Sequence, residues 1–345
     1  MTLTEVMYTV RRSLPFIIVL LVIIFLLYGI LLFFININKH KTIITLNPTF
    51  GKIQQPQVAN YLKFPQNPLF TLDTIQGKPI VATEAGRVFF IPKPRARFGY
   101  LQTIYLMARS VDFDTVIDTH QLSENIAIFS NTEQTLTIDV GNYNFTYDTQ
   151  YENHPEYFSE AIIPDEDTVK QDANNFLSKM GRYPVDLHQG DNNIIYLAHT
   201  EDSKDFIVVK SPRQADVVEV DFFRPDIDTF PVVAPRYFNS QNYIVMTYKQ
   251  GKMNVIKAQI KYFEKNDQSG NYPLLTGEEA WNNFIQGTGT VIANQNATNT
   301  ISITEMYLGY LDIENYQPYL QPVYFFLGEN NFIGFTPALR AEYLQ

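Results

Sequence analysis

The sequence predicts an α+β fold, in which one N-terminal transmembrane helix is followed by tandem units of a helix packed on an antiparallel sheet. Three observations support this class: a long uncharged run near the N-terminus, short segments that alternate apolar and polar residues, and two helix signals that are each followed by such segments. Alternation with a period of two indicates half-buried strands, whereas apolar residues three and four apart indicate amphipathic helices.

The first of these observations is the uncharged run at residues 14–35. A helix needs about 20 apolar residues to cross the hydrocarbon core of a bilayer, and this run is long enough. A cleavable signal peptide has a shorter apolar core of about 7–15 residues followed by small residues at a cleavage site, and neither feature is present. We therefore expect an uncleaved signal anchor, with a cytoplasmic stub over residues 1–12 and a transmembrane helix in the bilayer over residues 13–36.

Basic residues next to the apolar run predict its orientation. Arg11 and Arg12 directly precede the run, whereas Lys39 and Lys41 follow it at a short distance. This pattern places the N-terminus in the cytoplasm and the C-terminal domain outside, in a single-pass protein of the cell membrane. The chain has no cysteine, which excludes disulfides and Cys-ligated metal sites and favours a bacterial cell envelope over a secreted eukaryotic context.

The composition of the remaining chain indicates a folded, acidic protein. With 22 Tyr and 26 Phe among 345 residues, the chain has enough apolar surface for a packed core. Its length favours more than one structural unit. The net charge is −10, so we expect no nucleic-acid partner.

A juxtamembrane connector over residues 37–68 and a β-rich unit over residues 69–160 are expected after the anchor. Four prolines interrupt the connector, which therefore cannot form one helix. An amphipathic segment over residues 99–113 predicts a helix in the β-rich unit. Its strands are predicted at residues 69–72, 87–91, 121–129, 135–140 and 143–147.

A first α+β unit is expected over residues 161–270. Its helix starts with Pro164-Asp165-Glu166-Asp167, whose acidic residues suit the positive end of the helix dipole, and it runs to about Met180, where Gly181 supplies the stop. The turn at residues 249–252 predicts a hairpin. The strands of this unit are predicted at residues 194–198, 206–209, 215–223, 243–248 and 255–263.

A second α+β unit is expected over residues 271–345. Thr276 and Glu279 form a capping-box pattern that begins a helix extending to about Gln286. The segment Asn282-Asn283-Phe284 aligns with Asn174-Asn175-Phe176 in the preceding helix, which favours a tandem repeat. The strands of this unit are predicted at residues 301–311, 322–327 and 332–339.

The C-terminal part of the chain contains the strings EEAWNNFIQGTG, ITEMYLGYLDI, YLQPVYFF and FIGFTPALR. Residues from about 164 to 345, together with the position of the predicted anchor, resemble extracytoplasmic PepSY-like domains and are most similar to the WalK-regulating YycH/YycI-type proteins of Gram-positive bacteria. Uncharacterised anchored proteins of candidate-phyla bacteria are similar as well. The resemblance implies stacked units of a helix on an antiparallel sheet, and a non-enzymatic role in binding or restraining another envelope protein. It carries over no functional residue.

The sequence contains no motif typical of catalysis or cofactor binding. The five histidines include no pair spaced i, i+4 and no H-E-x-x-H, and the chain has neither G-x-S-x-G nor S-x-x-K. The glycines at 287 and 289 lie after a predicted helix and before a strand, which is the wrong order for a phosphate loop. We therefore expect no enzymatic activity, no cofactor, and no catalytic or metal-binding residue.

Three clusters of acidic residues are candidate cation sites. They comprise Asp112, Asp114 and Asp118 near His120; Asp165, Glu166 and Asp167; and Asp221, Asp226 and Asp228. Helix capping explains the second cluster fully. Solvated turns are the preferred interpretation of the other two, and a hard cation bound by carboxylate oxygens is the alternative.

The last unit is rich in tyrosine, and we expect an exposed aromatic patch there to bind a partner. The candidate partner surface consists of Tyr307, Tyr310, Tyr316, Tyr319 and Tyr324, with the sheet core as the competing interpretation. The expected function is that of a non-enzymatic envelope protein that binds, regulates or scaffolds another envelope protein. Two alternatives remain open: a module that binds cell-wall glycans, and a wall hydrolase that uses two carboxyl groups about 5–9.5 Å apart. The sequence sets neither the partner nor the oligomeric state.

Overall fold

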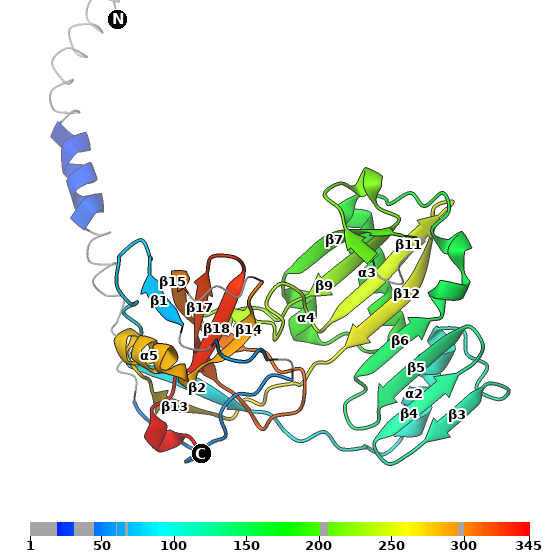
Figure 1. The fold of residues 1–345 in the computed structure, drawn as a ribbon, viewed down its shortest axis with the longest axis horizontal. Coiled ribbons are helices and arrows are strands. Elements are labelled where there is room, and N and C mark those ends of the chain that lie inside the picture. Colours follow the sequence, from blue (N-terminus) through cyan, green and yellow to red (C-terminus); the bar gives the residue numbers. More distant parts are fainter. Residues whose placement is uncertain (1–18, 31–44, 60, 66–67, 201–205, 296–299) are drawn as a thin grey trace, which may run out of the picture. The chain divides into compact units, whose positions relative to one another are not determined.

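The computed structural model describes residues 19–30, 45–59, 61–65, 68–200, 206–295 and 300–345 (Figure 1). The chain divides into two compact units, Met1–Thr45 and Leu46–Gln345. All the sheets described below belong to the second unit.

The N-terminal apolar run is helical over residues 19–30. In the part of the chain that the structure describes, no helix is both long and apolar enough to span a membrane. This finding contradicts the predicted anchor over residues 13–36. It also contradicts the predictions that depend on that anchor, which are the single-pass membrane topology and the extracytoplasmic location. Residues 13–18 and 31–36, like the predicted stub, lie outside the described residues.

The largest sheet has nine strands, all antiparallel to their neighbours. In sheet order the strands are β3 (Thr119–Leu122), β4 (Ile126–Ser130), β5 (Gln134–Asp139), β6 (Phe145–Thr149), β12 (Lys252–Ile260), β11 (Tyr243–Lys249), β9 (Val217–Phe222), β7 (Asn192–His199) and β8 (Phe206–Val208). The strands β3–β6 follow helix α2 (Tyr100–Ser110), and the other five follow helix α3 (Glu166–Met180). The two sets meet where β6 pairs with β12, so one sheet joins two of the predicted units.

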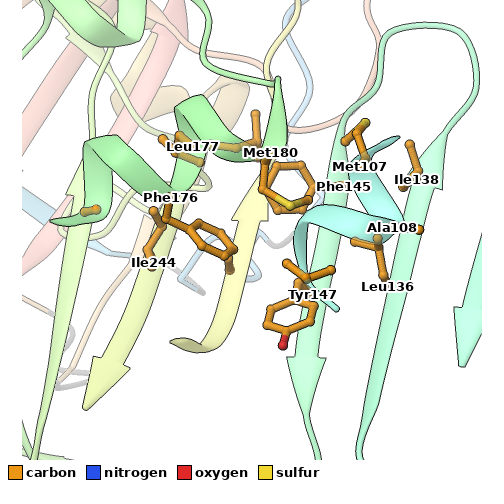
Figure 2. Packing of buried hydrophobic residues seen from close by; sticks show 14 of the residues in the cluster. Met107, Ala108, Leu136, Ile138, Phe145, Tyr147, Phe176, Leu177, Met180 and Ile244 are labelled. Atoms are coloured by element: carbon orange, nitrogen blue, oxygen red, sulfur yellow. The ribbon is translucent and has the colours of Figure 1, made fainter. Parts of the chain in front are cut away.

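Helices α2 and α3 both pack on one face of the nine-stranded sheet (Figure 2). Met107 of α2 and Met180 of α3 lie in the same buried cluster as side chains from β5 and β6. The ring of Phe176 on α3 lies 6.2 Å from that of Tyr147 on β6. Because successive strand residues point to opposite faces, the other face of β4–β6 carries more exposed residues, including Ile126 and Thr146.

Local sequence signals place α3 and the β11–β12 hairpin where they were predicted. The Asp165 carboxylate accepts the backbone N–H of Thr168 at 3.0 Å, and Gly181 ends the helix with a φ of 72°. The hairpin turns through Gln250 and Gly251, whose φ angles of 52° and 76° are those of a tight primed turn. These predictions are confirmed.

The predicted strand over residues 121–129 is instead two strands, β3 and β4. The hydroxyl of Ser123 accepts the backbone N–H of Ile126 at 3.0 Å, and its own backbone N–H donates to the carbonyl of Ile126 at 2.9 Å. This serine therefore builds a turn before the apolar residues that start at Ile126, and this local interaction interrupts the predicted strand.

The second sheet has six strands, and buried apolar clusters pack on both of its faces. Its order is β1 (Leu69–Leu72), β15 (Thr300–Leu311), β17 (Pro322–Gly328), β18 (Phe332–Pro337) and β14 (Thr290–Ala293), and β10 (Val232–Val233) also pairs with β15. Helix α5 (Gly277–Asn283) packs on one face, where the ring of Phe284 stacks on Phe326 at 4.2 Å. The capping box of Thr276 and Glu279 is present as predicted. The helix ends before Gln286, in an irregular turn over Phe284–Thr288.

A third, three-stranded sheet consists of β13 (Ser269–Pro273), β2 (Ala85–Phe90) and β16 (Tyr319–Leu320). The described residues are therefore mainly β, and the predicted α+β class with tandem helix-on-sheet units is wrong. The physical reason is long-range pairing. Strands β1 and β10 pair with β15, and β2 pairs with β13 and β16, so strands from separate predicted units complete one another's hydrogen bonds.

Two carboxyl groups lie side by side on β9, on the face opposite the two helices. Asp221 is fully buried, and one of its oxygens accepts the backbone N–H of Ser240 at 3.2 Å. Its other oxygen faces no donor among the described residues, and the Glu219 side chain is its neighbour. Burial and the Glu219 charge raise the pKa of Asp221 to about 8, although the nearby Arg236 acts in the opposite direction. A proton on Asp221 removes the repulsion between its carboxylate and that of Glu219.

Replacing Asp221 with Asn is expected to flatten the pH dependence of stability. The pKa of Asp in an unfolded chain is about 3.9. Between about pH 4 and pH 8 the folded protein therefore holds a proton on Asp221 that the unfolded chain releases. The free energy of unfolding of the wild type therefore decreases as the pH rises through this window. Urea unfolding at a series of pH values measures the slope.

The exposed Asp73 provides the matched control, because Asp73→Asn removes a carboxylate that is open to solvent. A slope for Asp221→Asn equal to those of the wild type and of the control variant would contradict the raised pKa of Asp221.

Candidate functional site

A buried guanidinium joins the nine-stranded sheet to the six-stranded sheet. Arg224 follows β9, and its side chain is 1% exposed. Its Nε donates to Oδ1 of Asp312, the residue after β15, at 3.1 Å. Its two Nη atoms donate to the Tyr262 hydroxyl at 2.7 Å and to the Phe263 carbonyl at 2.9 Å. Arg224 therefore holds the chain segments that leave β9, β12 and β15.

The charge of Arg224 is balanced inside this cluster. The guanidinium lies 4.0 Å from the centre of the Tyr262 ring, and Asp186 approaches it at 3.5 Å. The second oxygen of Asp312 accepts a hydrogen bond from Gln241 at 2.8 Å. Burial lowers the pKa of Arg224, but the attractions of Asp312, Tyr262 and Asp186 together outweigh this effect and raise the pKa above its ordinary value.

A pocket of about 530 Å³ opens beside this cluster. Phe263, whose carbonyl is bound by Arg224, is part of its wall. The other walls come from residues 93–96, from β4–β6 and their adjoining turns between residues 124 and 146, from Ile260 and Lys261, and from residues 314–316. We call this site the Tyr316 pocket.

Aromatic and aliphatic side chains form much of the Tyr316 pocket. The rings of Phe263 and Tyr316 lie 6.1 Å apart, and the Tyr316 hydroxyl donates to the Ile91 carbonyl at 3.3 Å. Burial raises the pKa of Tyr316. Ile126 lines the same pocket and is 44% exposed, so the apolar surface continues onto the open face of the sheet.

Charges of both signs surround this apolar surface. Lys261 donates to Glu314 at 2.9 Å, and Arg236 lies 3.6 Å from the same carboxylate. Lys93 and Arg95 are exposed at the rim. A pocket with aromatic side chains and a rim of mixed charge is suited to a peptide or another polar chain molecule.

One glycine allows the segment before α2 to form a wall of the pocket. A Cβ atom on Gly141 would lie 2.9 Å from Cβ of Pro94 and 3.0 Å from the backbone nitrogen of Arg95. Gly141 lies in the turn between β5 and β6, where its backbone N–H donates to Asp139 at 2.7 Å. The segment at Pro94 and Arg95 therefore crosses this turn at a distance that only glycine permits.

The five tyrosines of the candidate partner surface do not form one patch. Tyr310 and Tyr324 are buried, and their hydroxyls donate to the carbonyls of Arg87 and Leu275. Burial raises the pKa of Tyr324 to about 12.

The other three tyrosines are half-buried and lie at different places. Tyr319 on β16 packs 5.2 Å from the ring of Phe50. Tyr316 lines the pocket described above, and Tyr307 lines a separate cavity of about 600 Å³ beside β15.

Side chains of the acidic clusters form hydrogen bonds and ion pairs within the fold. Asp114 accepts the N–H of Val116 at 2.9 Å and its own N–H donates to Asp118, while Asp228 pairs with Arg87. Within the described ranges, no group of three or more histidine, aspartate or glutamate side chains is placed to hold a metal ion. The carboxyl pair on β9 does not line the Tyr316 pocket.

Sequence reasoning missed the residues that organise the pocket. Arg224 is not among the predicted site residues, although an arginine directly after a strongly apolar strand is a signal for a buried ion pair. Phe263, Lys261 and Glu314 carry no local signal, because they converge only through the pairing of distant strands.

Replacing Arg224 with Met is expected to lower the free energy of unfolding by about 3–5 kcal/mol, because the Asp312 carboxylate is left buried without its cation. Urea denaturation at neutral pH measures the change. Arg213→Met, at an exposed position, serves as the control and is expected to stay within about 0.5 kcal/mol of the wild type. A loss of less than about 1 kcal/mol for Arg224→Met would show that the ion pair does not hold the sheets together.

No family model matches the chain, and no curated protein matches it either. Among solved structures, an uncharacterised protein from Eubacterium rectale ATCC 33656 is similar, with a TM-score of 0.38 and 12% sequence identity. The match covers 74% of this chain and 84% of that chain. A TM-score of this size carries no argument about fold or function, and the resemblance to PepSY-like proteins stays a prediction.

Proposed function

We propose that this chain is a non-enzymatic binding protein that holds a segment of a partner protein in the Tyr316 pocket. The observation that carries the proposal is the pocket itself, with a volume of about 530 Å³ and the Phe263 and Tyr316 rings in its wall. Pockets of about 300–1,000 Å³ are typical ligand sites, and aromatic residues dominate the energy of protein interfaces.

The polar groups of the pocket support binding rather than catalysis. Glu314 is engaged by Lys261, and Asp139 is engaged by the N–H groups of its own turn. Glu124 is the third carboxylate of the lining, so the described residues of the pocket do not offer two free carboxyl groups for acid–base chemistry. The pocket wall includes no serine or histidine among the described residues, so a nucleophile with an adjacent base is not formed there.

An oligosaccharide is the second candidate ligand. Tyr316 lies next to Asn315, and the carboxylate of Glu124 is at the same pocket. An aromatic face beside amide and carboxylate groups also suits a sugar ring. The same experiments distinguish the two ligands.

Cross-linking from the pocket tests this proposal. A photoreactive benzoylphenylalanine at position 126 is expected to capture one predominant protein in cells, because Ile126 is 44% exposed at the pocket. The same residue at position 116 provides the control, since Val116 is 86% exposed and does not line the pocket. A purified fragment of the captured protein should then bind the full-length chain, and Tyr316→Ala should weaken this binding about tenfold.

Two results would contradict the proposal. One is equal capture from positions 126 and 116, which would indicate that proteins contact this chain without binding specifically in the Tyr316 pocket. The other is binding of the captured fragment that Tyr316→Ala leaves unchanged. Binding to a defined oligosaccharide that depends on Tyr316, without any captured protein, would favour the second candidate.

A further inference from the structure

The six-stranded sheet has a gap along the outer edge of its longest strand. On this edge of β15, β1 pairs in parallel with residues 300–303 and β10 pairs in parallel with residues 310–311. Between them, residues 304–309 pair only with β17 on the other side, within the part of the chain that the structure describes. The middle of β15 therefore has an unpaired edge on the side opposite β17.

The backbone groups of Met306 and Leu308 point into this gap. The N–H groups of Tyr310 and Asp312 donate outward, to the carbonyls of Pro231 and Val233, each at 2.8 Å. Alternate residues of a strand point the same way, and the register with β17 is unbroken from Glu305 to Tyr310. The N–H and C=O groups of Met306 and Leu308 consequently face the gap, and no partner for them is found among the described residues. Such groups are a template for an added strand.

A cavity of about 600 Å³ opens at the same edge. Most of its lining is apolar and comes from Ile80, Val81, Ala82, Phe230, Pro231 and Leu308. Val81 is 91% exposed, so this wall is open to solvent. The cavity is therefore suited to apolar side chains of a strand that lies against β15.

The charge of the cavity indicates what kind of strand it accepts. Glu305 is exposed and is the one charged residue of the lining within the described residues. The whole chain carries a net charge of −10. A lysine or arginine in the incoming strand would meet this carboxylate, whereas an acidic strand would be repelled.

We propose that the gap in β15 is a docking site for an extended segment of a partner protein, which adds as a strand along residues 304–309. The segment would place alternate apolar side chains in the cavity and a basic side chain opposite Glu305. At about 3.3 Å per residue the gap is roughly 20 Å long, which suits four to six residues. This mode of recognition is β-strand addition, in which backbone hydrogen bonds give affinity and side-chain pockets give specificity.

This site is independent of the proposed function. The linings of the Tyr316 pocket and of the β15 cavity have no residue in common. Variants at one site therefore leave the other unchanged, and either proposal can fail alone.

Amide exchange in the free protein tests the open edge. The N–H groups of Met306 and Leu308 are expected to exchange at least tenfold faster than those of Tyr307 and Gly309, which face β17. Residue-resolved hydrogen exchange of the full-length chain measures this alternation. Equal protection at all four amides would mean that the edge is already paired and would overturn the proposal.

Selection from a random dodecapeptide library displayed on phage tests the occupant. The full-length chain is expected to enrich peptides that alternate apolar residues and contain Lys or Arg, and bound peptide should slow exchange at Met306 and Leu308. Val81→Asp should weaken the binding of a selected peptide about tenfold, and Glu305→Lys should reverse the preference for basic residues. Val116→Asp, at a position that is 86% exposed outside the cavity, should have no effect.

Three results would overturn the proposal. The first is no enrichment of any peptide family, and the second is enrichment of peptides whose binding Val81→Asp and Glu305→Lys leave unchanged. The third is a dimer seen by sedimentation that Val81→Asp dissociates, because the occupant would then be a second copy of this chain.

Discussion

The ion pair between Arg224 and Asp312 is the interaction on which the rest of the structure depends. Arg224 leaves the nine-stranded sheet and Asp312 leaves the six-stranded sheet, so their contact joins two sheets that have separate cores. A buried charge is costly unless its hydrogen bonds are satisfied. Here the guanidinium donates hydrogen bonds to Asp312, to the Tyr262 hydroxyl and to the Phe263 carbonyl. These bonds replace the water that the buried charge has lost, and they fix the position of Arg224.

The position of Arg224 also determines the geometry of the Tyr316 pocket. The guanidinium fixes Phe263 through its carbonyl, and it fixes the start of the segment that contains Glu314 through Asp312. The pocket is thus a product of the joint between the sheets, and neither sheet alone contains its walls. The β15 edge differs, because strand pairing inside the six-stranded sheet creates it without any contribution from this ion pair.

Most individual elements could be predicted from the sequence, whereas their assembly could not. Helix α3 is confirmed because its cap, its apolar stripe and its stop are encoded within the helix and its flanking residues. The same holds for the hairpin at Gln250 and Gly251. The pairing of β6 with β12, or of β1 with β15, depends on which distant strand has an unpaired edge. The alternation of apolar and polar residues shows which face of a strand is buried, but it does not identify the partner strand.

The predicted repeat illustrates this limit. The aligned Asn-Asn-Phe segments of α3 and α5 indicated tandem units, but α3 instead shares its sheet with α2, which shows no such similarity. Each predicted helix is followed by strands, but those strands do not form the separate sheets that the repeat predicts. The tyrosines were ambiguous for a related reason. The assembled sheets bury Tyr310 and leave Tyr316 in a pocket, and this difference comes from long-range pairing.

Comparing the unfolding of the two sheets tests most directly whether the Arg224 cluster makes them one cooperative structure. Trp281 is the single tryptophan of the chain and packs beside the six-stranded sheet, so its fluorescence reports that sheet. The chain has no cysteine, and a fluorophore on Lys179→Cys would report the nine-stranded sheet from an exposed position on α3. Urea denaturation should give the same midpoint with both probes. Separate midpoints in the wild type would show that the sheets unfold independently and would contradict this account.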